Sequence, residues 1–365
     1  MGFDTLFMPG IILCVGILTI WLGFRRFLSL SGNGPRKCLR WIERAVLLPV
    51  ILLLLCITGV SALNTVKIWS FHPHESTPGE INLVDGHMMH INCTGSGSPT
   101  LVLESGWGSS WQIWIKVQAA LSKTTRVCSY DRPGYGYSDA QPDPRDADHI
   151  AIELHSLLTQ AKITGPIVLM GHSVGGLFIC DYATRYPEEV AGLVFVDAVS
   201  PSWGLGKVNA FPHWFARLGL RTACSTNTFV LVGSCAWPRP GTGPRWKLAI
   251  GGLCHQQVCA LGPESDSFAR SGEETVQTGP YGALPILIIS HDPAKWPADW
   301  ENAWSTMQED LKKLSTRSRR IVARNSTHVI QLERPDLLNK EVPLFIEQIR
   351  GTAAQPASYG STVTE

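Results

Sequence analysis

Hydrophobic and polar positions follow two patterns in this 365-residue chain, one in the first 70 residues and another beyond about residue 80. Residues 5–24 and 45–66 are uncharged and largely apolar, and each reaches the roughly 20 residues that a membrane-spanning helix needs. Beyond Ile81, short apolar runs rich in β-branched residues alternate with longer stretches of helical periodicity. The pattern predicts two transmembrane helices followed by a separate α/β domain.

The second pattern predicts a sheet of eight strands. A hairpin signal, Asp85-Gly86, separates the first two strands, at residues 81–84 and 87–92. Strands that alternate with helices of this length form mostly parallel sheets with helices on both faces. The remaining strands are expected at residues 100–104, 126–130, 166–170, 192–197, 284–290 and 320–323, and the helices at residues 110–121, 147–161, 176–183, 300–314 and 337–349.

Two segments depart from this alternation. Residues 199–280 are rich in Gly, Pro and Trp, and we interpret them as a cap inserted over the C-terminal edge of the sheet. Residues 351–365 are small and polar, which is typical of a disordered tail. The predicted domains are therefore a membrane anchor over residues 1–70 and an α/β domain over residues 78–350.

The charges around the two apolar segments predict the side of the membrane that the α/β domain occupies. The connector between the segments carries six basic residues and one acidic residue, Glu43. Because basic connectors stay in the cytoplasm, the α/β domain is expected outside the cytoplasm. Val60-Ser61-Ala62 also resembles a signal-peptide cleavage site, and a cleaved signal peptide would export the same domain. The net charge of +1 gives no reason to expect a nucleic-acid partner.

The ten cysteines agree with an exported domain. Cys93, Cys128 and Cys180 lie in predicted strands or helices, where a cysteine is usually a buried, weakly polar residue. Four others lie in the predicted cap, and in an oxidising compartment they favour two disulfides. Their spacing is not that of a zinc site, so no metal is expected. The pairs favoured by sequence order are Cys224 with Cys235 and Cys254 with Cys259.

One motif identifies a candidate nucleophile. Gly171-His172-Ser173-Val174-Gly175 stands between the predicted strand at residues 166–170 and the predicted helix at residues 176–183. A G-x-S-x-G sequence at such a junction is a nucleophile elbow, in which a tight turn exposes the serine hydroxyl. Ser173 is therefore the predicted nucleophile. His172 is expected to face away from the reacting side, as a packing or hydrogen-bonding residue.

Two further motifs, together with the elbow, carry a resemblance to a known family. Asp131-Arg132-Pro133-Gly134-Tyr135-Gly136-Tyr137-Ser138 is similar to the family's D-x-P-G-x-G-x-S loop. Asn325-Ser326-Thr327-His328 stands after the last strand, where the family carries its histidine. Over about residues 80–350 the chain resembles the α/β-hydrolase fold family, of the serine esterase and lipase type. The resemblance implies a triad of serine, acid and histidine that works without a cofactor.

The resemblance assigns His328 as the general base and leaves the acid between alternatives. The family order of serine, acid and histidine points to Asp292, in the loop after the strand at residues 284–290. Asp292 comes slightly earlier than the family's common spacing. Asp197, at the end of the preceding strand, is therefore the rival, and Asp299 ranks behind both. Asp292 is the predicted acid.

The oxyanion hole is expected to use two backbone N–H groups. Val174 follows the nucleophile, and Trp107 lies in the loop after the third predicted strand, so these two residues are the predicted donors. Ser105-Gly106 stands where the family has His-Gly, so a second donor shifted by one residue is the alternative. Tryptophans cluster beside this loop and recur in the cap, which favours an apolar acyl or alkyl group in the substrate.

These features predict a membrane-anchored serine hydrolase, with its catalytic domain outside the cytoplasm, that cleaves an ester of apolar or lipid-like character. The expected partners are this small-molecule substrate and the lipid bilayer, with no cofactor. Epoxide hydrolases and haloalkane dehalogenases of this fold use an aspartate nucleophile, so Ser173 argues against both. Peptidase, thioesterase and acyltransferase activities use the same triad and stay open, as does a non-catalytic binding scaffold.

Overall fold

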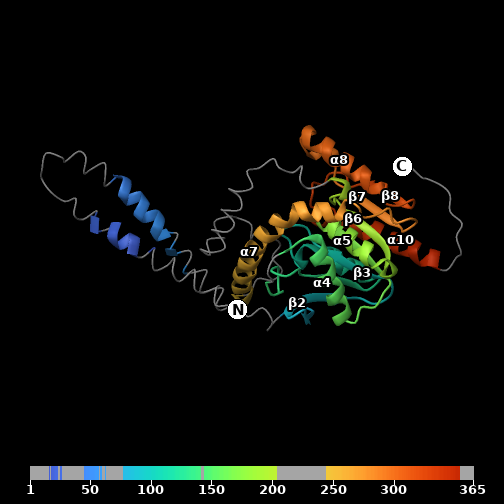
Figure 1. Ribbon diagram of the computed structural model, residues 1–365, viewed down its shortest axis with the longest axis horizontal. Helices are drawn as coiled ribbons and strands as arrows, with labels where there is room; N and C mark the ends of the chain where they lie inside the picture. The colour runs from blue at the N-terminus through green and yellow to red at the C-terminus, as the bar shows by residue number, and fades with distance from the viewer. Residues whose placement is uncertain are drawn as a thin grey trace. The chain divides into compact units, whose positions relative to one another are not determined.

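Figure 1 shows the computed structural model of the chain. The structure describes residues 16, 18–23, 25–26, 45–56, 58–59, 62, 77–140, 144–203 and 244–353. The chain divides into two units, one formed by Met1–Glu75 with Pro212–Gly262 and the other by Ser76–Phe211 with Pro263–Glu365. Each unit is described by itself.

The second unit is built on the predicted eight-stranded sheet, whose strands lie in the order β1-β2-β4-β3-β5-β6-β7-β8. β1 and β2 form the antiparallel hairpin at Asp85-Gly86, and β2 is also antiparallel to β4. All other neighbouring strands are parallel, as the sequence predicts. The strands are β1 (Glu80–Val84), β2 (His87–Thr94), β3 (Thr100–Glu104), β4 (Val127–Tyr130), β5 (Ile167–His172), β6 (Val190–Val196), β7 (Ile286–Ser290) and β8 (Ser318–Val322).

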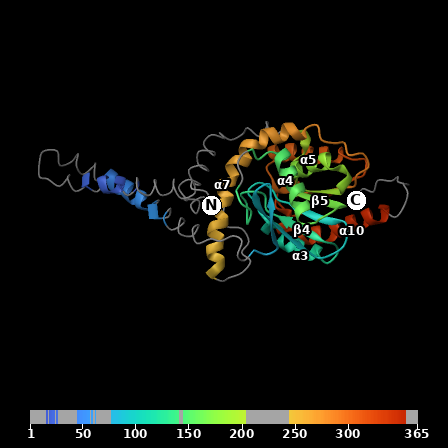
Figure 2. The ribbon, with the colours of Figure 1, turned by 60° about the horizontal axis from the view of Figure 1, so that its bottom comes forward.

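Helices cover both faces of this sheet (Figure 2). Alternate residues of β5 point to opposite faces, so Leu169 packs in the core beneath α4 (Ala147–Gln160) and α5 (Gly175–Arg185). Met170 packs in the core beneath α3 (Ile115–Leu121) and α10 (Pro335–Ala353). The other helical segments are η1 (Trp111–Trp114), η2 (Pro187–Glu189), η3 (Pro201–Trp203), α7 (Pro244–Thr275), η6 (Pro293–Lys295), α8 (Ala298–Lys312) and α9 (Ile330–Glu333).

The predicted cap contains the long helix α7, whose part from Pro263 onward belongs to the second unit. The hydroxyls of Ser267 and Ser271 accept hydrogen bonds from the backbone N–H groups of Arg145 and Ala147, at 3.1 and 3.0 Å. The free N–H groups at the start of α4 are thereby satisfied by α7. The rest of the predicted cap, residues 204–243, lies outside the described residues.

In the first unit, residues 18–23 and 45–56 are helical. Within the described parts of the chain, no helix is both long and apolar enough to cross a membrane. The predicted spans at residues 5–24 and 45–66 lie partly outside those parts, and they are not confirmed. At the other end of the chain, α10 extends to Ala353, three residues into the predicted tail, and residues 354–365 lie outside the described residues.

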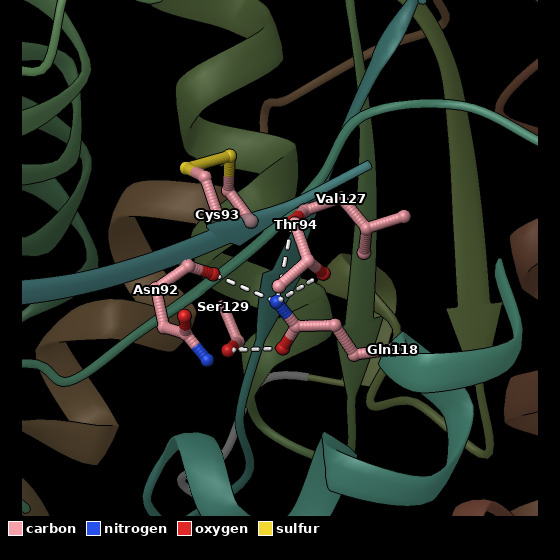
Figure 3. The surroundings of a disulfide bond; sticks show 7 residues. Asn92, Cys93, Thr94, Gln118, Val127 and Ser129 are labelled. Atoms are coloured by element: carbon pink, nitrogen blue, oxygen red, sulfur yellow. Dashed lines mark hydrogen bonds between the residues drawn. A yellow bond between two sulfur atoms is a disulfide. The ribbon is translucent and has the colours of Figure 1, made fainter. Parts of the chain in front are cut away.

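The structure corrects the expectation that Cys93 and Cys128 are separate buried thiols. They form a disulfide that joins β2 to β4 (Figure 3). The two residues stand directly opposite each other in the antiparallel ladder, with their Cα atoms 4.0 Å apart. Strand register therefore brings the two sulfurs within bonding reach, which sequence position alone did not reveal. Cys180 is a buried free thiol, as expected.

The side chain of Gln118 joins α3 to the strands that carry this disulfide (Figure 3). Its amide nitrogen donates to the carbonyl oxygen of Asn92, at 2.7 Å, and its amide oxygen accepts from the Ser129 hydroxyl, at 2.6 Å.

In the cap, Cys259 is disulfide-bonded, but Cys224, Cys235 and the side chain of Cys254 lie outside the described residues. The predicted cap pairing stays a prediction.

Candidate active site

Ser173 occupies a strained turn between β5 and α5. Its φ angle is +56°, in the left-handed region that residues with a Cβ rarely adopt. The turn is held on both sides, because the Ser173 carbonyl accepts from the N–H groups of Gly176, at 3.0 Å, and Val199, at 2.9 Å. This strand–turn–helix geometry is that of a nucleophile elbow.

The glycines around Ser173 are required by close backbone contacts. A Cβ atom on Gly171 would lie 2.7 Å from the carbonyl oxygen of Gly175, and one on Gly175 would lie 2.9 Å from the carbonyl oxygen of Ser105. A Cβ atom on Gly176 would lie 2.7 Å from the Cβ atom of Ala198. Small residues at these positions let the turn pass between β3 and the end of β6.

His328 lies in the loop between β8 and α9, and it contacts both Ser173 and Asp197. Its Nε2 atom lies 2.9 Å from Ser173 Oγ, and its Nδ1 atom lies 2.7 Å from Asp197 Oδ2. With the proton on Nδ1, the ring donates to Asp197 and accepts from the serine hydroxyl. The three side chains therefore form a continuous hydrogen-bonded chain, with the aspartate at its buried end.

The acid beside His328 is Asp197, and the expectation of Asp292 is corrected. The Asp292 carboxylate accepts from the backbone N–H groups of Asn325, at 2.8 Å, and Ala294, at 3.1 Å, and these bonds hold its pKa below the ordinary value. Asp292 therefore caps the turn at η6. β6 and β7 are parallel neighbours, so their C-terminal ends lie side by side, and sequence order could not decide which of them faces the histidine. The side chain of Asp299 lies outside the described residues.

Asp197 is a fully buried carboxylate in a dense set of donors. Burial acts to raise its pKa, but hydrogen bonds from His291 and His328, together with the charges of these rings, hold the pKa below the ordinary value. Its φ angle of +45° places the residue in the left-handed region. His291 was not expected at the site, although its position beside Asp292, in the loop after β7, was a signal for it.

His172 supports the loop that carries His328. Its Nε2–H group donates to the carbonyl oxygen of His328 at 2.9 Å, and the two rings lie 4.7 Å apart. Burial lowers the pKa of His172 to about 3, so its ring is neutral at physiological pH. This contact agrees with the hydrogen-bonding role expected for His172, but its ring lies beside that of His328, so the expectation that it faces away from the reacting side is wrong.

The loop after β3 passes directly against Ser173. A Cβ atom on Gly106 would lie 3.0 Å from the Cβ atom of Ser173, so only glycine allows this approach. Trp107 follows on this loop and is 42% exposed, with its ring edge toward Phe268 of α7 at 5.8 Å. Val174 is the N-cap of α5, where the first N–H groups of a helix lack partners within the helix. Both predicted oxyanion donors therefore belong to backbone segments that adjoin Ser173.

Arg132 fixes the loop after β3 by hydrogen bonds to its backbone. Its guanidinium group is buried and donates to the carbonyl oxygens of Ser105, at 2.7 Å, and Gly106, at 3.1 Å. It also forms ion pairs with Glu104 of β3, at 2.5 Å, and Glu264 of α7, at 3.0 Å. Arg132 therefore connects the loop after β3, which carries the predicted oxyanion donor Trp107 (the oxyanion loop), to the helix α7, a role that the sequence motif alone did not indicate.

Asp131, the first residue of the same motif, organises the turn that follows β4. Its carboxylate accepts from the N–H groups of Trp111, at 2.8 Å, and Tyr137, at 3.0 Å, and it contacts Nδ1 of His90 at 2.7 Å. A Cβ atom on Gly136 would lie 2.0 Å from this carboxylate, which explains the second glycine of the motif.

Among the side chains that the structure describes, no group of three or more His, Cys, Asp or Glu residues could hold a metal ion.

Comparison with known proteins agrees with this architecture. A family model of the alpha/beta hydrolase fold matches residues 99–220. An uncharacterized protein of Schizosaccharomyces pombe is 28% identical over 306 residues, which cover 70% of this chain and 53% of that protein. The (lyso)-N-acylphosphatidylethanolamine lipase of Mus musculus is 31% identical over 157 residues, which cover 40% of this chain and 44% of the lipase. The chain thus spans about half the length of these two relatives.

The solved structure of an esterase from Exiguobacterium antarcticum aligns with a TM-score of 0.54 and 19% sequence identity, and covers 74% of this chain and 99% of the esterase. At this level of sequence identity, the alignment supports a shared fold and nothing further. Together with the sheet order and the elbow, the comparisons identify the class of fold. Residues 99–220 match the α/β-hydrolase family model, and the second unit has the α/β-hydrolase fold.

Proposed function

We propose that this protein is a serine hydrolase that cleaves carboxylic esters, with Ser173 as nucleophile, His328 as general base and Asp197 as the acid that orients the histidine. The observation that carries the proposal is the hydrogen-bonded chain of these three side chains, with 2.9 Å between Ser173 Oγ and His328 Nε2 and 2.7 Å between His328 Nδ1 and Asp197 Oδ2. A serine hydroxyl is a weak nucleophile until a base within hydrogen-bond reach accepts its proton.

The reaction follows from this geometry in two half-reactions. Ser173 Oγ attacks the ester carbonyl while its proton passes to His328 Nε2, and the carbonyl oxygen becomes an oxyanion that accepts from the N–H groups of Val174 and Trp107. The tetrahedral intermediate collapses, His328 returns the proton to the leaving alcohol, and an acyl-enzyme remains. Water then attacks the acyl carbonyl by the same proton route, which releases the carboxylic acid and restores Ser173.

Apolar residues beside the serine support an apolar acyl group as the substrate. Val174 and Val199 belong to a buried apolar cluster against which Phe268 and Trp296 pack. Trp107 and Phe268 place two aromatic rings next to the oxyanion loop, and the indole of Trp107 is 42% exposed. Partly exposed aromatic rings of this kind bind apolar ligand groups well. The likeness to the mouse lipase also favours a lipid-like ester.

We also propose that the N-terminal region anchors the domain in a membrane, outside the cytoplasm. Support comes from close helix contacts in the first unit, where Cβ atoms on Gly16 and Gly23 would lie 3.0 Å from Thr58 Oγ1 and 3.3 Å from Ile51 Cγ1. The two helical segments therefore pack side by side in opposite directions, with small residues at their contact. The disulfide of the catalytic domain favours an oxidising compartment. Large apolar side chains on these segments are exposed, namely Leu18, Trp21, Leu22, Val46, Leu48, Val50, Leu52, Leu53 and Leu55.

Labelling of membrane fractions with a fluorophosphonate probe tests the serine and its acid. We expect the wild type to react, and Ser173→Ala and His328→Ala to lose labelling. Asp197→Asn is expected to slow labelling by about 10³–10⁴-fold, because the amide no longer holds the required tautomer. Asp292→Asn, an equally conservative change in the neighbouring loop, is the matched control and is expected to label at nearly the wild-type rate.

Two results would contradict the proposal. A folded wild type that does not react with the probe would favour the non-catalytic scaffold. Full labelling of Asp197→Asn together with loss of labelling in Asp292→Asn would identify Asp292 as the acid.

Separate extraction of the membranes with alkaline carbonate tests the anchor, since an integral protein stays in the pellet whereas a peripheral one is released.

A further inference from the structure

Asp197 is held by more donors than His328 alone. The carboxylate also accepts from the backbone N–H of His291, at 3.1 Å, and from the indole N–H of Trp304, at 3.0 Å. The Nδ1 atom of His291 lies 2.8 Å from Oδ1 and 2.9 Å from Oδ2 of the same carboxylate. Two histidine rings therefore share one buried aspartate.

The second ring nitrogen of His291 meets another carboxylate. Its Nε2 atom lies 2.8 Å from Glu301 Oε2, on α8, and the other oxygen of Glu301 accepts from the Ser305 hydroxyl at 2.5 Å. His291 is 2% exposed, and its ring packs against Trp296, with 4.6 Å between centroids. The imidazole is thus enclosed between two acids, with little access for water.

The contacts of His291 require a proton on each ring nitrogen. An ionised carboxylate can only accept hydrogen bonds, so both Nδ1 and Nε2 must donate when Asp197 and Glu301 are ionised. Burial acts to lower the pKa of His291, but the hydrogen bonds and charges of Asp197 and Glu301 outweigh burial and raise the pKa. Of the described side chains, Asp197 and Glu301 are the ionisable groups in contact with this ring, since Asp292 points toward Asn325 instead. The resulting group of two carboxylates and one cation has a net charge of −1.

We infer that His291 and Glu301 are positioning residues of the catalytic site, which extend the chain Ser173–His328–Asp197 by two further members. His291 fixes the carboxylate of Asp197 through its ring and its backbone N–H. Its positive charge offsets part of the negative charge on Asp197. The negative charge of Glu301, on the other side of the ring, in turn offsets part of the positive charge of His291. The pair thereby sets the charge that stabilises protonated His328 during the reaction. This inference rests on the proposed function.

Charge arithmetic distinguishes this role from simple packing. His291→Asn keeps an amide N–H near the place of Nδ1 but removes the cation, so the group changes from −1 to −2. Glu301→Gln keeps an acceptor for Nε2–H but removes an anion, so the group changes from −1 to 0. The double variant returns the group to −1. A more negative group stabilises the protonated imidazole of His328 more strongly, and a neutral group stabilises it less.

The experiment measures the pH dependence of the rate constant for fluorophosphonate labelling, whose acid limb reports the ionisation of the base. We expect His291→Asn to move this limb upward and Glu301→Gln to move it downward, each by about one pH unit for a charge two contacts away. We expect the double variant to return near the wild-type limb. Slower labelling with an unmoved acid limb in both single variants would overturn the inference, because it would indicate a structural role alone.

A second measurement does not depend on activity. In the Ser173→Ala background, the thermal unfolding midpoint is followed against pH with and without His291→Asn. The stabilisation from protonated His291 is present below the unfolded pKa of about 6.5 and is lost as pH rises through the raised folded pKa. A difference between the two proteins that shrinks as pH rises supports the inference even if the wild type does not label, in which case only the proposed function fails. A difference independent of pH would overturn the inference.

Discussion

Replacement of Arg132 by methionine tests whether the buried guanidinium group organises the oxyanion loop. The change leaves Glu104 and Glu264 buried with no cation, and it removes the donors of the Ser105 and Gly106 carbonyls. Removal of one partner from a buried ion pair costs about 3–5 kcal/mol, and a buried carbonyl left unpaired costs about 1–3 kcal/mol. These costs overlap, so we expect the free energy of unfolding to fall by about 4–5 kcal/mol at pH 8.

The loss is expected to be smaller at low pH. Burial already raises the pKa of Glu104 with Arg132 in place, and loss of the cation raises this pKa further, because the positive charge of Arg132 acts to lower it. A folded-state pKa above the unfolded value means that the folded protein binds more protons, so stability increases as pH falls. Between pH 8 and pH 5 we expect the variant to recover about half of the lost free energy.

Chemical unfolding of the purified protein at both pH values measures this change, and fluorophosphonate labelling measures its effect on the site. Arg145→Met is the matched control, since Arg145 is also buried and paired with Glu153, at 2.5 Å, but it does not contact the oxyanion loop. Both variants should be less stable, and only Arg132→Met should label slowly while still folded. An equal effect of both variants on labelling, or a loss below about 1 kcal/mol in Arg132→Met, would refute this reasoning.

Two further changes test features outside the ionic network. Replacement of Cys93 and Cys128 by alanine opens a 35-residue loop, and the chain-entropy relation gives a loss of about 4 kcal/mol, while Cys180→Ala should cost about 1 kcal/mol. Equal midpoints for the two variants in urea would contradict this expectation. Gly175→Ala places a methyl group 2.9 Å from the Ser105 carbonyl and should reduce both labelling and thermal stability. Gly262→Ala, where no atom lies within 4 Å of the added group, should reduce neither, and comparable losses in both variants would exclude the steric explanation.

The sequence was sufficient to predict the sheet and the nucleophile turn. Both are local features, because strand and helix periodicity is visible within each segment, and the elbow is a short motif between β5 and α5. The residues that surround His328 in the sequence were sufficient to place it in the loop after the last strand. These predictions depend on contacts between residues close in sequence, or on an order of elements that the parallel sheet largely fixes.

Contacts between distant segments required the tertiary structure. Asp197 and Asp292 both follow strands that end at the same edge of the sheet, and the turn of each loop decides which carboxylate points at His328. The disulfide depends on the register of β2 against β4, which one residue of slip would abolish. Arg132 and His291 acquire partners from distant parts of the chain, since Arg132 pairs with Glu264 and His291 contacts Asp197, 132 and 94 residues away in the sequence. Side-chain direction and strand register are set by packing of the whole domain, and for this reason the sequence determined the fold and the elbow turn at Ser173, while only the folded chain showed which carboxylate faces His328.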